Sequence, residues 1–520
     1  MKTKQLFFCS LTGLALLTAS CSSNDEALNG GDGTTSEGKT YAQIAISVAN
    51  SATTRTTTPG KTGDEAYGDD AEYTVKDLTV VLANENDIAM QVITPTLKTA
   101  TNTDDDDKLV RVTEPFKCTP GTYKVYVLAN YKNSQDALTP IIKGSTDMKA
   151  EFGITNIAKL STTDEFFMTN VSAPERQEIK EAATGKELND AGKDETKEGA
   201  ATNLNILTVN VERAVSKVTF DNTDNQSFNV MVGDNKIATA TLEGASLINL
   251  NKKMYLVKEG RTATNKPAGV TDKWPYPMDP NYSQTSIDEA YCKANFEQRS
   301  ATVFPAPSTA TFYCPENTME ASAQLNGQTT GVVYKVKYAP VDGYYTELAK
   351  DGTDNYSQMF AKVLNLADKD EAITDKIFTE ATTADKADGT FYSYNGYVFK
   401  SKAAARLYKA IATTVGDAAD VNAAFKTNAN DVDIQTYAEG YCYYTAWIKH
   451  NPGGTTMQQD KYGVVRNFWY ELKVNSIKKL GYSKPTYEKP TDPDDKAEAS
   501  IQVQVKIKKW RLVKQNVDLE

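Results

Sequence analysis

The sequence is poor in histidine, because His450 is the only one among 520 residues. A metal site with several histidine ligands is therefore excluded, and a serine-type triad has only this one position for its base. Cys442 lies in the same region, but no signature of a cysteine nucleophile surrounds the two residues. We predict that the protein is not an enzyme and has no catalytic, metal-binding or cofactor-binding residue.

Positive charge is also in deficit. Lys and Arg together number 57, against 68 Asp and Glu, which gives a formal net charge of −11 at pH 7. Nucleic acids and anionic membranes attract proteins through an excess of positive charge. The balance therefore predicts that the chain has no nucleic-acid partner.

Cysteine is scarce for a chain of this length, with 6 residues in total. Cys9 and Cys21 lie near the start, and the others are Cys118, Cys292, Cys314 and Cys442. Four cysteines allow three pairings if all are bonded, and the sequence does not choose among them. Disulfide scaffolds are far denser in cysteine, so we expect structural or free thiols.

No apolar stretch reaches the ~18 residues that a membrane helix needs. Residues 6–17 instead form the apolar region of a secretory signal over residues 1–21, after Lys2 and Lys4. The sequence Leu17-Thr18-Ala19-Ser20-Cys21 resembles the lipobox of bacterial lipoproteins, whose cysteine is acylated, and the acidic run after it resembles a surface-export signal of Bacteroidetes lipoproteins. This resemblance implies an outer-membrane lipoprotein precursor with lipid, such as palmitate, on Cys21. The alternative is an ordinary cleaved signal with an incidental cysteine.

What the sequence does contain is strand-like patterning. Tyr alone accounts for 28 residues, and runs of β-branched and aromatic residues recur between turn signals. We predict strands at 75–82, 88–93, 109–112, 122–129, 204–211, 216–220, 238–250, 331–338, 441–449 and 468–477. Helical insertions are expected at 287–298, capped by Ser286, and at 403–413 with 418–425. The predicted fold class is mainly all-β.

The first strand is predicted at residues 41–50. Apolar and polar positions alternate there, with one face formed by Ala42, Ile44, Ile46 and Val48. The next segment, 51–60, is polar and rich in threonine, which predicts an exposed loop. It contains Arg55, the first arginine of the chain, followed by Thr56.

The C-terminal end combines a linker with a strand. Residues 484–496 carry three prolines among acidic residues, which predicts a stiff, extended linker. Beyond it lies an alternating strand whose apolar residues are Ile501, Val503, Val505 and Ile507, with a change of phase at Trp510 and Leu512. A bulge near Lys508–Lys509 is expected to keep all of them on one face. This strand is either a late edge strand or one made to pair elsewhere, because it has no obvious partner in its own domain.

Two further runs have an ordinary interpretation. The acidic run Asp104–Asp107 offers calcium ligands but lacks the glycine turn and the distal Glu of an EF-hand, so we predict a solvated loop. The aromatic run Tyr441–Trp447 has strand spacing, which predicts rings alternating between core and surface rather than a binding platform.

Several motifs carry a family resemblance. The specific set is 462–470, 477–481 and 517–519, and weaker similarities occur at 120–127, 211–218 and 313–318, with a patchy middle at 260–440. Together they resemble the fimbrillins of Bacteroidales, in particular the shaft subunits of short, Mfa-type fimbriae. The linker is shorter and less proline-rich than in that group, and the helical insertions need not follow it.

The resemblance implies two transthyretin-like β-sandwich domains, at 56–203 and 204–483. A signal (1–21) and a propeptide (22–55) precede them, and a proline linker with a donor strand (484–520) follows. It also implies that an Arg-specific protease cuts between Arg55 and Thr56 and removes the first strand, with Ile44, Ile46 and Val48. The groove then accepts the C-terminal strand of the next subunit, with Ile501, Val503, Val505, Ile507, Trp510 and Leu512.

The implied partners are further copies of the chain in a head-to-tail polymer, accessory anchor and tip fimbrillins, the protease, and host or bacterial surface receptors. A head-to-tail contact that does not close produces a filament. The mature protein is then expected in extracellular fimbriae, supporting adhesion and colonisation. Two alternatives remain open, an accessory or tip fimbrillin and a monomeric surface lipoprotein that binds glycans.

Overall fold

The structure is a computed structural model that describes residues 40–48, 65–98, 109–181, 205–222, 226–260, 276–284, 286–297, 303–342, 384–413, 420, 423–425, 431–485, 489–495 and 500–511. Cys21, Arg55, Thr56, Leu512 and the acidic run 104–107 lie outside these residues. Only the backbone of Trp510 is described.

The N-terminal part is built on one nine-stranded sheet. Its main path is β4-β3-β7-β11-β13-β1-β5, with β12 paired to β7 and β6 paired to β1. The strands are β1 (Thr40–Val48), β3 (Leu78–Ala83), β4 (Ala89–Ile93), β5 (Leu109–Val112), β6 (Phe116–Cys118), β7 (Gly121–Ala129), β11 (Met168–Asn170), β12 (Arg176–Ile179) and β13 (Asn205–Arg213).

The C-terminal part pairs a five-stranded sheet with a four-stranded one. The first has the order β2-β27-β26-β14-β20, and the second β15-β16-β21-β25. Phe220 of β14 and Tyr334 of β21 meet edge to face with their ring centroids 6.0 Å apart, which joins the two sheets through a shared core. The strands are β2 (Glu65–Tyr67), β14 (Val215–Phe220), β15 (Ser227–Val232), β16 (Asn235–Ile248), β20 (Thr311–Pro315), β21 (Gly331–Pro340), β25 (Tyr441–Trp447), β26 (Phe468–Ile477) and β27 (Ile501–Arg511).

Short elements complete the described fold. The minor strands are β8 (Phe152–Gly153), β9 (Ser161–Thr162), β10 (Glu165–Phe166), β17 (Leu250–Asn251), β18 (Lys253–Met254), β19 (Phe296–Glu297), β22 (Phe391–Tyr394), β23 (Tyr397–Phe399) and β24 (Gln435–Tyr437). The α-helices are α1 (Tyr131–Ser134), α2 (Glu289–Asn295) and α5 (Lys402–Thr413), and the 3-10 turns include η2 (Asp70–Glu72). None of the helices in the described ranges is long and apolar enough to cross a membrane.

These elements confirm the mainly all-β fold with β-sandwich packing. Each strand predicted between residues 75 and 477 is present, with its ends shifted by at most a few residues. The first strand is β1, and the helix predicted at 403–413 is α5. The helix predicted at 287–298 is shorter, and its cap is Asp288, whose carboxylate accepts a hydrogen bond from the backbone N–H of Tyr291 at 2.7 Å, rather than Ser286.

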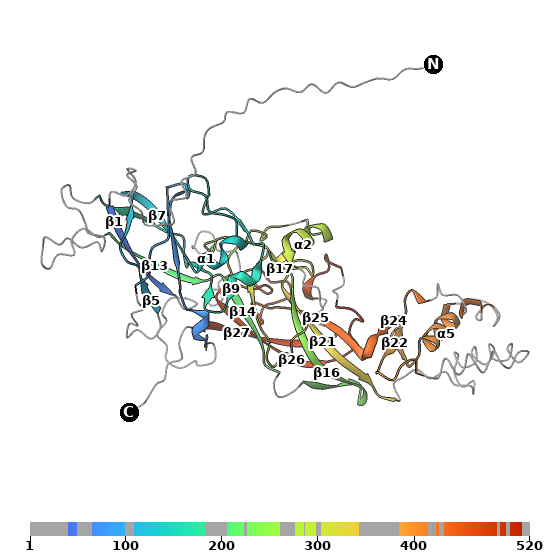
Figure 1. Cartoon of the computed structure of the whole chain (residues 1–520). Coiled ribbons are helices and arrows are strands. Elements are labelled where there is room, and N and C mark those ends of the chain that lie inside the picture. The colour runs from blue at the N-terminus through green and yellow to red at the C-terminus, as the bar shows by residue number, and fades with distance from the viewer. Residues whose placement is uncertain are drawn as a thin grey trace, which may run out of the picture.

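The N- and C-terminal sheets meet at Ala214, whereas the division into domains after residue 203, which the family resemblance implies, stays a prediction. β13 pairs with β1 and β11 in the N-terminal sheet, and β14 begins the C-terminal one immediately after Ala214. Ala214 is buried, so no exposed linker marks the boundary in the sequence. Figure 1 shows the N-terminal sheet, the C-terminal sandwich and the α5 region arranged in a row.

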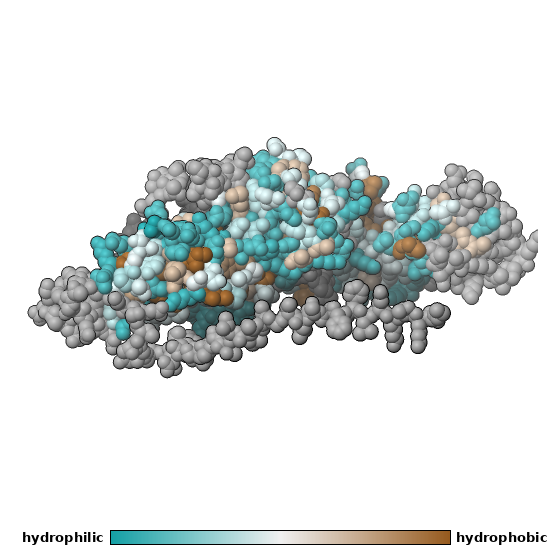
Figure 2. All heavy atoms as spheres, turned by 90° about the horizontal axis from the view of Figure 1, so that it is seen from above, coloured by the Kyte–Doolittle hydropathy of each residue, from teal (hydrophilic) through white to brown (hydrophobic). Residues whose placement is uncertain are grey.

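The α5 region has a small core of its own. Leu407 and Tyr408 of α5 pack with Tyr392 and Phe399 of the β22–β23 hairpin. In the space-filling view, the visible described surface is mainly hydrophilic, with small and scattered apolar areas (Figure 2). The described part of that face therefore shows no broad apolar patch of the kind that marks a large protein interface.

Candidate functional site

The strand near the start of the chain, β1, is an interior strand of its sheet. It pairs in parallel with β13 on one edge and antiparallel with β5 and β6 on the other. Its inward side chains, Ala42, Ile44, Ile46 and Val48, are all 0% exposed. β1 therefore fills a closed apolar slot with a strand wall on each side.

Thr113 bridges a gap in one wall of this slot. Between β5 and β6, its hydroxyl accepts a hydrogen bond from the Ile44 N–H at 3.1 Å, and its own N–H donates to the Ile44 carbonyl at 3.0 Å. The Gln43 side chain also donates to the Thr113 carbonyl at 2.8 Å. β1 is thus hydrogen-bonded on this edge even where the wall changes strand.

The C-terminal strand, β27, lies in its own subunit. It pairs antiparallel with β26 along its length, so the partner that was not obvious from the sequence lies in its own domain. Ile501, Val505 and Ile507 are 3%, 7% and 4% exposed. The pairing arises because the apolar side chains of β27 extend the apolar face that Phe468, Tyr470 and Leu472 form on β26, and both strands pack on the same core.

The bulge expected at Lys508–Lys509 is also absent. The register between β26 and β27 is regular there and shifts instead between Val474 and Ser476 of β26. The opposite edge of β27 pairs with β2, where Glu65, Ala66 and Tyr67 face Lys509, Trp510 and Arg511.

The described part of the linker is docked on the body rather than extended. The carbonyls of Pro490 and Asp492 accept hydrogen bonds from the N–H groups of Gly327 and Asn326, each at 2.9 Å. Proline lacks a donor, but its carbonyl still accepts, so proline content did not prevent pairing. The approach is close, because a Cβ added at Gly327 would lie 2.7 Å from the Pro490 Cβ.

Two neighbouring aspartates fix the end of this linker. Asp494 is buried and accepts a hydrogen bond from the Thr329 hydroxyl at 2.5 Å. Asp495 accepts from the Lys461 ammonium at 2.5 Å and from the Tyr462 hydroxyl at 2.7 Å. The linker therefore holds the start of β27 close to its own domain.

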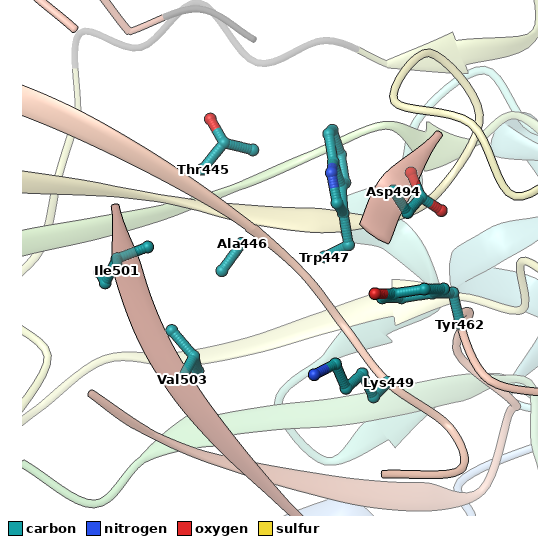
Figure 3. Close-up of a pocket in the computed structure, with 8 residues that line it drawn as sticks. All are labelled: Thr445, Ala446, Trp447, Lys449, Tyr462, Asp494, Ile501 and Val503. Atoms are coloured by element: carbon teal, nitrogen blue, oxygen red, sulfur yellow. The ribbon is translucent and has the colours of Figure 1, made fainter. Parts of the chain in front are cut away.

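A small pocket lies between the linker, β25 and β27. Ile501 and Val503 line one side, and Trp447, Tyr462 and Asp494 line another (Figure 3). Because β27 itself forms part of the wall, the pocket belongs to the packing beneath this strand and exists only while β27 is in place.

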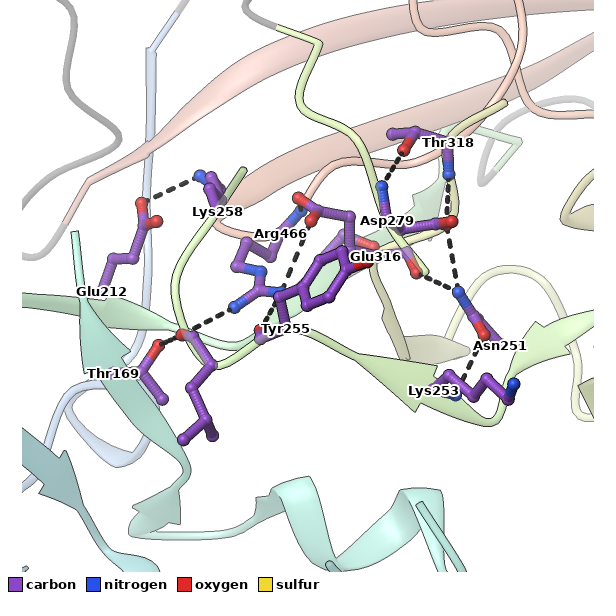
Figure 4. A network of polar contacts seen from close by, with 12 residues as sticks. Thr169, Glu212, Asn251, Lys253, Tyr255, Lys258, Asp279, Glu316, Thr318 and Arg466 are labelled. Atoms are coloured by element: carbon purple, nitrogen blue, oxygen red, sulfur yellow. Dashed lines mark hydrogen bonds and ion pairs between the residues drawn. The ribbon is translucent and has the colours of Figure 1, made fainter. Parts of the chain in front are cut away.

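Motifs that suggested the family resemblance meet in one buried junction (Figure 4). Arg466, from the 462–470 motif, donates to Glu316, from the 313–318 motif, at 3.4 Å, and to the carbonyls of Tyr255 and Leu256 at 2.7 and 3.2 Å. The side chains of Arg466 and Glu316 are 1% and 2% exposed. Sequence analysis found these motifs, but it did not reveal that they form a polar core.

The 211–218 motif joins the same junction from the N-terminal sheet. Glu212 of β13 pairs with Lys258 at 2.9 Å, with both side chains at most 2% exposed. Thr169 of β11 donates to the Leu256 carbonyl, which Arg466 also contacts. Sequence analysis did not use the one signal that could have found this site, which is the presence of charged residues among the apolar residues of a strand.

A second pair of buried charges lies near β2. Glu72 of η2 contacts the Lys217 ammonium at 2.6 Å and accepts a hydrogen bond from the Tyr313 hydroxyl at 2.5 Å. Lys217 also lies 4.0 Å from the ring centroid of Trp469 on β26. Glu72 thus ties the N-terminal segment 70–72 to two strands of the C-terminal sheet, β14 and β20, and Lys217 of β14 contacts a third, β26.

The remaining candidate groups are structural. Cys118, Cys292, Cys314 and Cys442 are all buried free thiols, in agreement with the sequence. Burial raises the pKa of Cys442 to about 12, which disfavours the reactive thiolate. Its Sγ lies 3.5 Å from the Tyr444 hydroxyl, whereas Nδ1 of His450 lies 2.6 Å from the Tyr470 hydroxyl. Cys442 and His450 thus contact two different tyrosines.

The run Tyr441–Trp447 alternates as predicted, because Cys442 and Tyr444 are buried and Tyr441 and Tyr443 are half-buried on the other face of β25. Within the described ranges, no group of three or more His, Cys, Asp and Glu side chains is placed to hold a metal ion. The described part of the candidate site consists of paired strands and buried ion pairs.

The sequence matches two family models. Residues 42–256 match the model described as "Major fimbrial subunit protein (FimA)", and residues 435–516 match "Major fimbrial subunit protein type IV, Fimbrillin, C-terminal". The first match contains β1 and β13, and the second contains β26 and β27. No curated protein sequence matches the chain.

Several solved structures are similar to this chain, two of them over nearly its whole length. A fimbrilin (fimA) from Porphyromonas gingivalis is 13% identical, with 92% of this chain and 99% of that one covered and a TM-score of 0.37. The tip fimbrial protein Mfa3 from the same organism is 10% identical, with coverages of 90% and 100% and a TM-score of 0.30. A fimbrial assembly protein from Parabacteroides distasonis is 13% identical, with coverages of 59% and 86% and a TM-score of 0.28. The two family models together span more than half of the sequence, and the chain belongs to the fimbrillin family of Bacteroidales, the structural subunits of surface fimbriae.

Proposed function

We propose that this chain is a polymerising fimbrial subunit that is acylated at Cys21, cleaved after Arg55 and assembled by donor-strand exchange. In this scheme β1 leaves with the propeptide, and β27 of the next subunit takes its place. The resulting filament supports adhesion and colonisation. Its partners are other copies of the chain, anchor and tip fimbrillins, an Arg-specific protease and surface receptors.

The position of β1 carries the proposal. Although β1 is the first strand of the described chain, it is an interior strand of its sheet. It lies between β13 on one edge and β5 with β6 on the other. Its removal opens two unpaired edges and an apolar slot, which is an unstable condition in water. Refilling the slot with four aliphatic side chains is worth roughly 6–12 kcal/mol as an upper bound.

β27 matches this slot in pattern and in length. Ile501, Val503, Val505 and Ile507 repeat the alternation of the inward residues of β1 with greater volume. On its own subunit, β27 has one long edge paired with β26 and only three residues paired with β2. The slot offers pairing along both edges, which favours exchange through strand addition.

The exchange also has a cost, because Ile501, Val505 and Ile507 leave the core of their own subunit and β26 loses its partner. While β1 fills the slot, no gain offsets this cost, and the precursor is expected to stay monomeric. Cleavage after Arg55 is therefore the proposed trigger.

The experiment compares the precursor, Arg55→Ala and the nearby control Lys61→Ala after treatment with an Arg-specific protease. Gels run in SDS after gentle and after full heating should show a ladder that collapses only on full heating for the precursor and the control. Arg55→Ala should give one full-length band. A ladder from Arg55→Ala would contradict cleavage as the trigger.

The alternatives give other patterns. A single band at both temperatures from the cleaved wild type would favour the monomeric glycan-binding lipoprotein. A tip subunit would give no ladder alone but would join one formed by a shaft subunit. In cells, Cys21→Ala should lose its lipid and fail to reach the surface, and normal surface fimbriae from that variant would refute the lipobox assignment.

A further inference from the structure

β27 is held on its own subunit by two strands, and the shorter of them comes from the start of the mature chain. β2 pairs in parallel with Lys509–Arg511, on the edge of β27 opposite β26. We call this three-residue pairing the β2 clamp. While it is in place, β27 has a strand on both edges at its C-terminal end, and that end cannot pair with another subunit.

The downstream end of β2 is firmly anchored. The Asp69 N–H donates to Glu72 at 3.0 Å at the start of η2, and Glu72 in turn pairs with Lys217 at 2.6 Å in a buried site. The ammonium of Lys217 lies 4.0 Å from the ring centroid of Trp469, and that of Lys508 on β27 lies 5.2 Å from the same centroid. The anchor of β2 and the end of β27 thus meet around one indole ring.

The upstream end of β2 is tied to β1, the interior strand of the N-terminal sheet. A pairing of three residues is weak by itself, since even a two-stranded hairpin is marginal in water. A segment tethered at both ends, however, is kept at high local concentration beside its partner. The Arg55–Thr56 bond lies in the sequence between β1 and β2, so its cleavage cuts one of the two tethers.

We infer that cleavage after Arg55 also weakens the β2 clamp, so that one cut prepares both the accepting slot and the donor strand of the same subunit. The inference rests on the proposed function and identifies how that function is regulated. The uncleaved precursor neither accepts nor donates a strand. The cleaved subunit can both accept and donate a strand. A subunit therefore cannot accept a neighbour's strand while its own β27 is still held by the β2 clamp.

Hydrogen exchange of the monomer tests the weakening directly. Precursor, cleaved protein and protease-treated Arg55→Ala are compared at a concentration too low for polymer. Amides of 507–511 should exchange about tenfold faster after cleavage, with no change in Arg55→Ala or in β21, which serves as the internal control. Equal exchange at 507–511 before and after cleavage would overturn the inference.

A disulfide across the clamp tests its role in assembly. Glu65 and Lys509 are register partners, so Glu65→Cys with Lys509→Cys should lock the clamp under oxidation. The oxidised and cleaved protein should polymerise at least about tenfold more slowly than the same protein after reduction, whereas each single-cysteine variant should not respond. Equal rates in both redox states, with the bond verified by mass, would overturn the inference.

These outcomes are separable from failure of the proposed function. No polymer in either redox state, and none from the wild type, would refute strand exchange itself. The hydrogen-exchange comparison would then decide alone whether cleavage loosens the clamp.

Discussion

The guanidinium Nε of Arg213 donates a hydrogen bond to Oδ1 of Asn467 across 2.9 Å, although the residues are 254 positions apart. Arg213 ends β13 of the N-terminal sheet, and Asn467 directly precedes β26 of the C-terminal sheet. Burial lowers the pKa of Arg213 to about 10, which still leaves the side chain charged at neutral pH. The two halves of the subunit are therefore joined by buried contacts of charged side chains.

Arg466 provides a test of this junction. Arg466→Met keeps the volume but leaves Glu316 buried without its cation, so the free energy of unfolding should fall by about 3–5 kcal/mol. The matched control is Lys293→Met, which breaks the exposed pair with Glu289 and should cost less than about 1 kcal/mol. Urea unfolding measures both, and equal losses would contradict a stabilising role for the junction.

The elements that the sequence predicts best are strands in which apolar and polar residues alternate regularly. β5 and β26 were predicted with their observed bounds, since alternation and flanking turn residues define them locally. β2 was missed, because three residues carry no period and its partner lies more than 400 positions away in sequence. The docked linker was missed for a related reason, because its hydrogen bonds use backbone carbonyls that residue type does not reveal.

Some features of the candidate site could likewise be predicted from local sequence, and others could not. The apolar faces of β1 and β27 follow from their own residues, and in the structure both are buried except for the half-buried Val503. The pairing of β27 with β26 depends on which edge is free in the folded sheet, and a local pattern does not contain that information. Arg55, Thr56 and Cys21 lie outside the described residues, and their roles stay predictions.

Asp494 and Asp495 should have opposite effects on the pH dependence of stability. Burial raises the pKa of Asp494 well above its usual value, so the folded state favours the protonated form. Its contribution is present at low pH and is lost as the pH rises above about 4. Asp494→Asn should therefore match wild type at pH 4 and exceed it at pH 8 by more than about 1 kcal/mol.

Asp495 is the matched control on the neighbouring residue. Burial alone raises its pKa, but hydrogen bonds from Lys461, Tyr462 and the Met457 N–H outweigh this and lower it. Its stabilisation is present above the usual carboxyl pKa and disappears as the pH falls. Asp495→Asn should lose about 1–3 kcal/mol at pH 7 and nothing near pH 2, as measured by urea unfolding across pH. The same sign for both variants would contradict the assignment.

The thiols should be silent in the folded protein. Burial raises the pKa of Cys118 to about 12 and that of Cys292 to about 11, and all four described cysteines are buried. The cleaved subunit should therefore release no thiolate-dependent colour from an aromatic disulfide reagent until it is unfolded. Rapid reaction of the native protein would contradict the burial of these thiols. A ladder that disappears with reductant alone would contradict strand exchange as the source of the polymer.

Deleting residues 500–520 removes β27 from its own subunit as well as from any neighbour. Because Ile501, Val505 and Ile507 are buried against the core, the deletion should destabilise the monomer as well as prevent polymerisation. Melting of the deletion variant therefore cannot distinguish a donor strand from an ordinary edge strand. A test must separate the packing of β27 on its own subunit from its pairing with a neighbouring subunit.

A synthetic peptide of residues 500–512 makes that separation. Added to cleaved protein that lacks β1, it should fill the open slot, block the ladder and raise the melting temperature with a dependence on peptide concentration. At a peptide concentration of 100 times Kd the gain should be about 2.7 kcal/mol. The uncleaved precursor should not respond, since β1 occupies the slot.

Two altered peptides complete the design. Val505→Asp with Ile507→Asp places carboxylates in an apolar slot at a cost of several kcal/mol and should abolish binding. Gln504→Asp with Lys506→Asp alters residues that are exposed in β27 and should bind within about 1 kcal/mol of the parent peptide. Equal binding of both altered peptides would show that binding does not depend on the apolar face of β27. Stabilisation of the uncleaved precursor would show that the peptide binds outside the β1 slot. Either result would contradict β27 as the occupant of that slot.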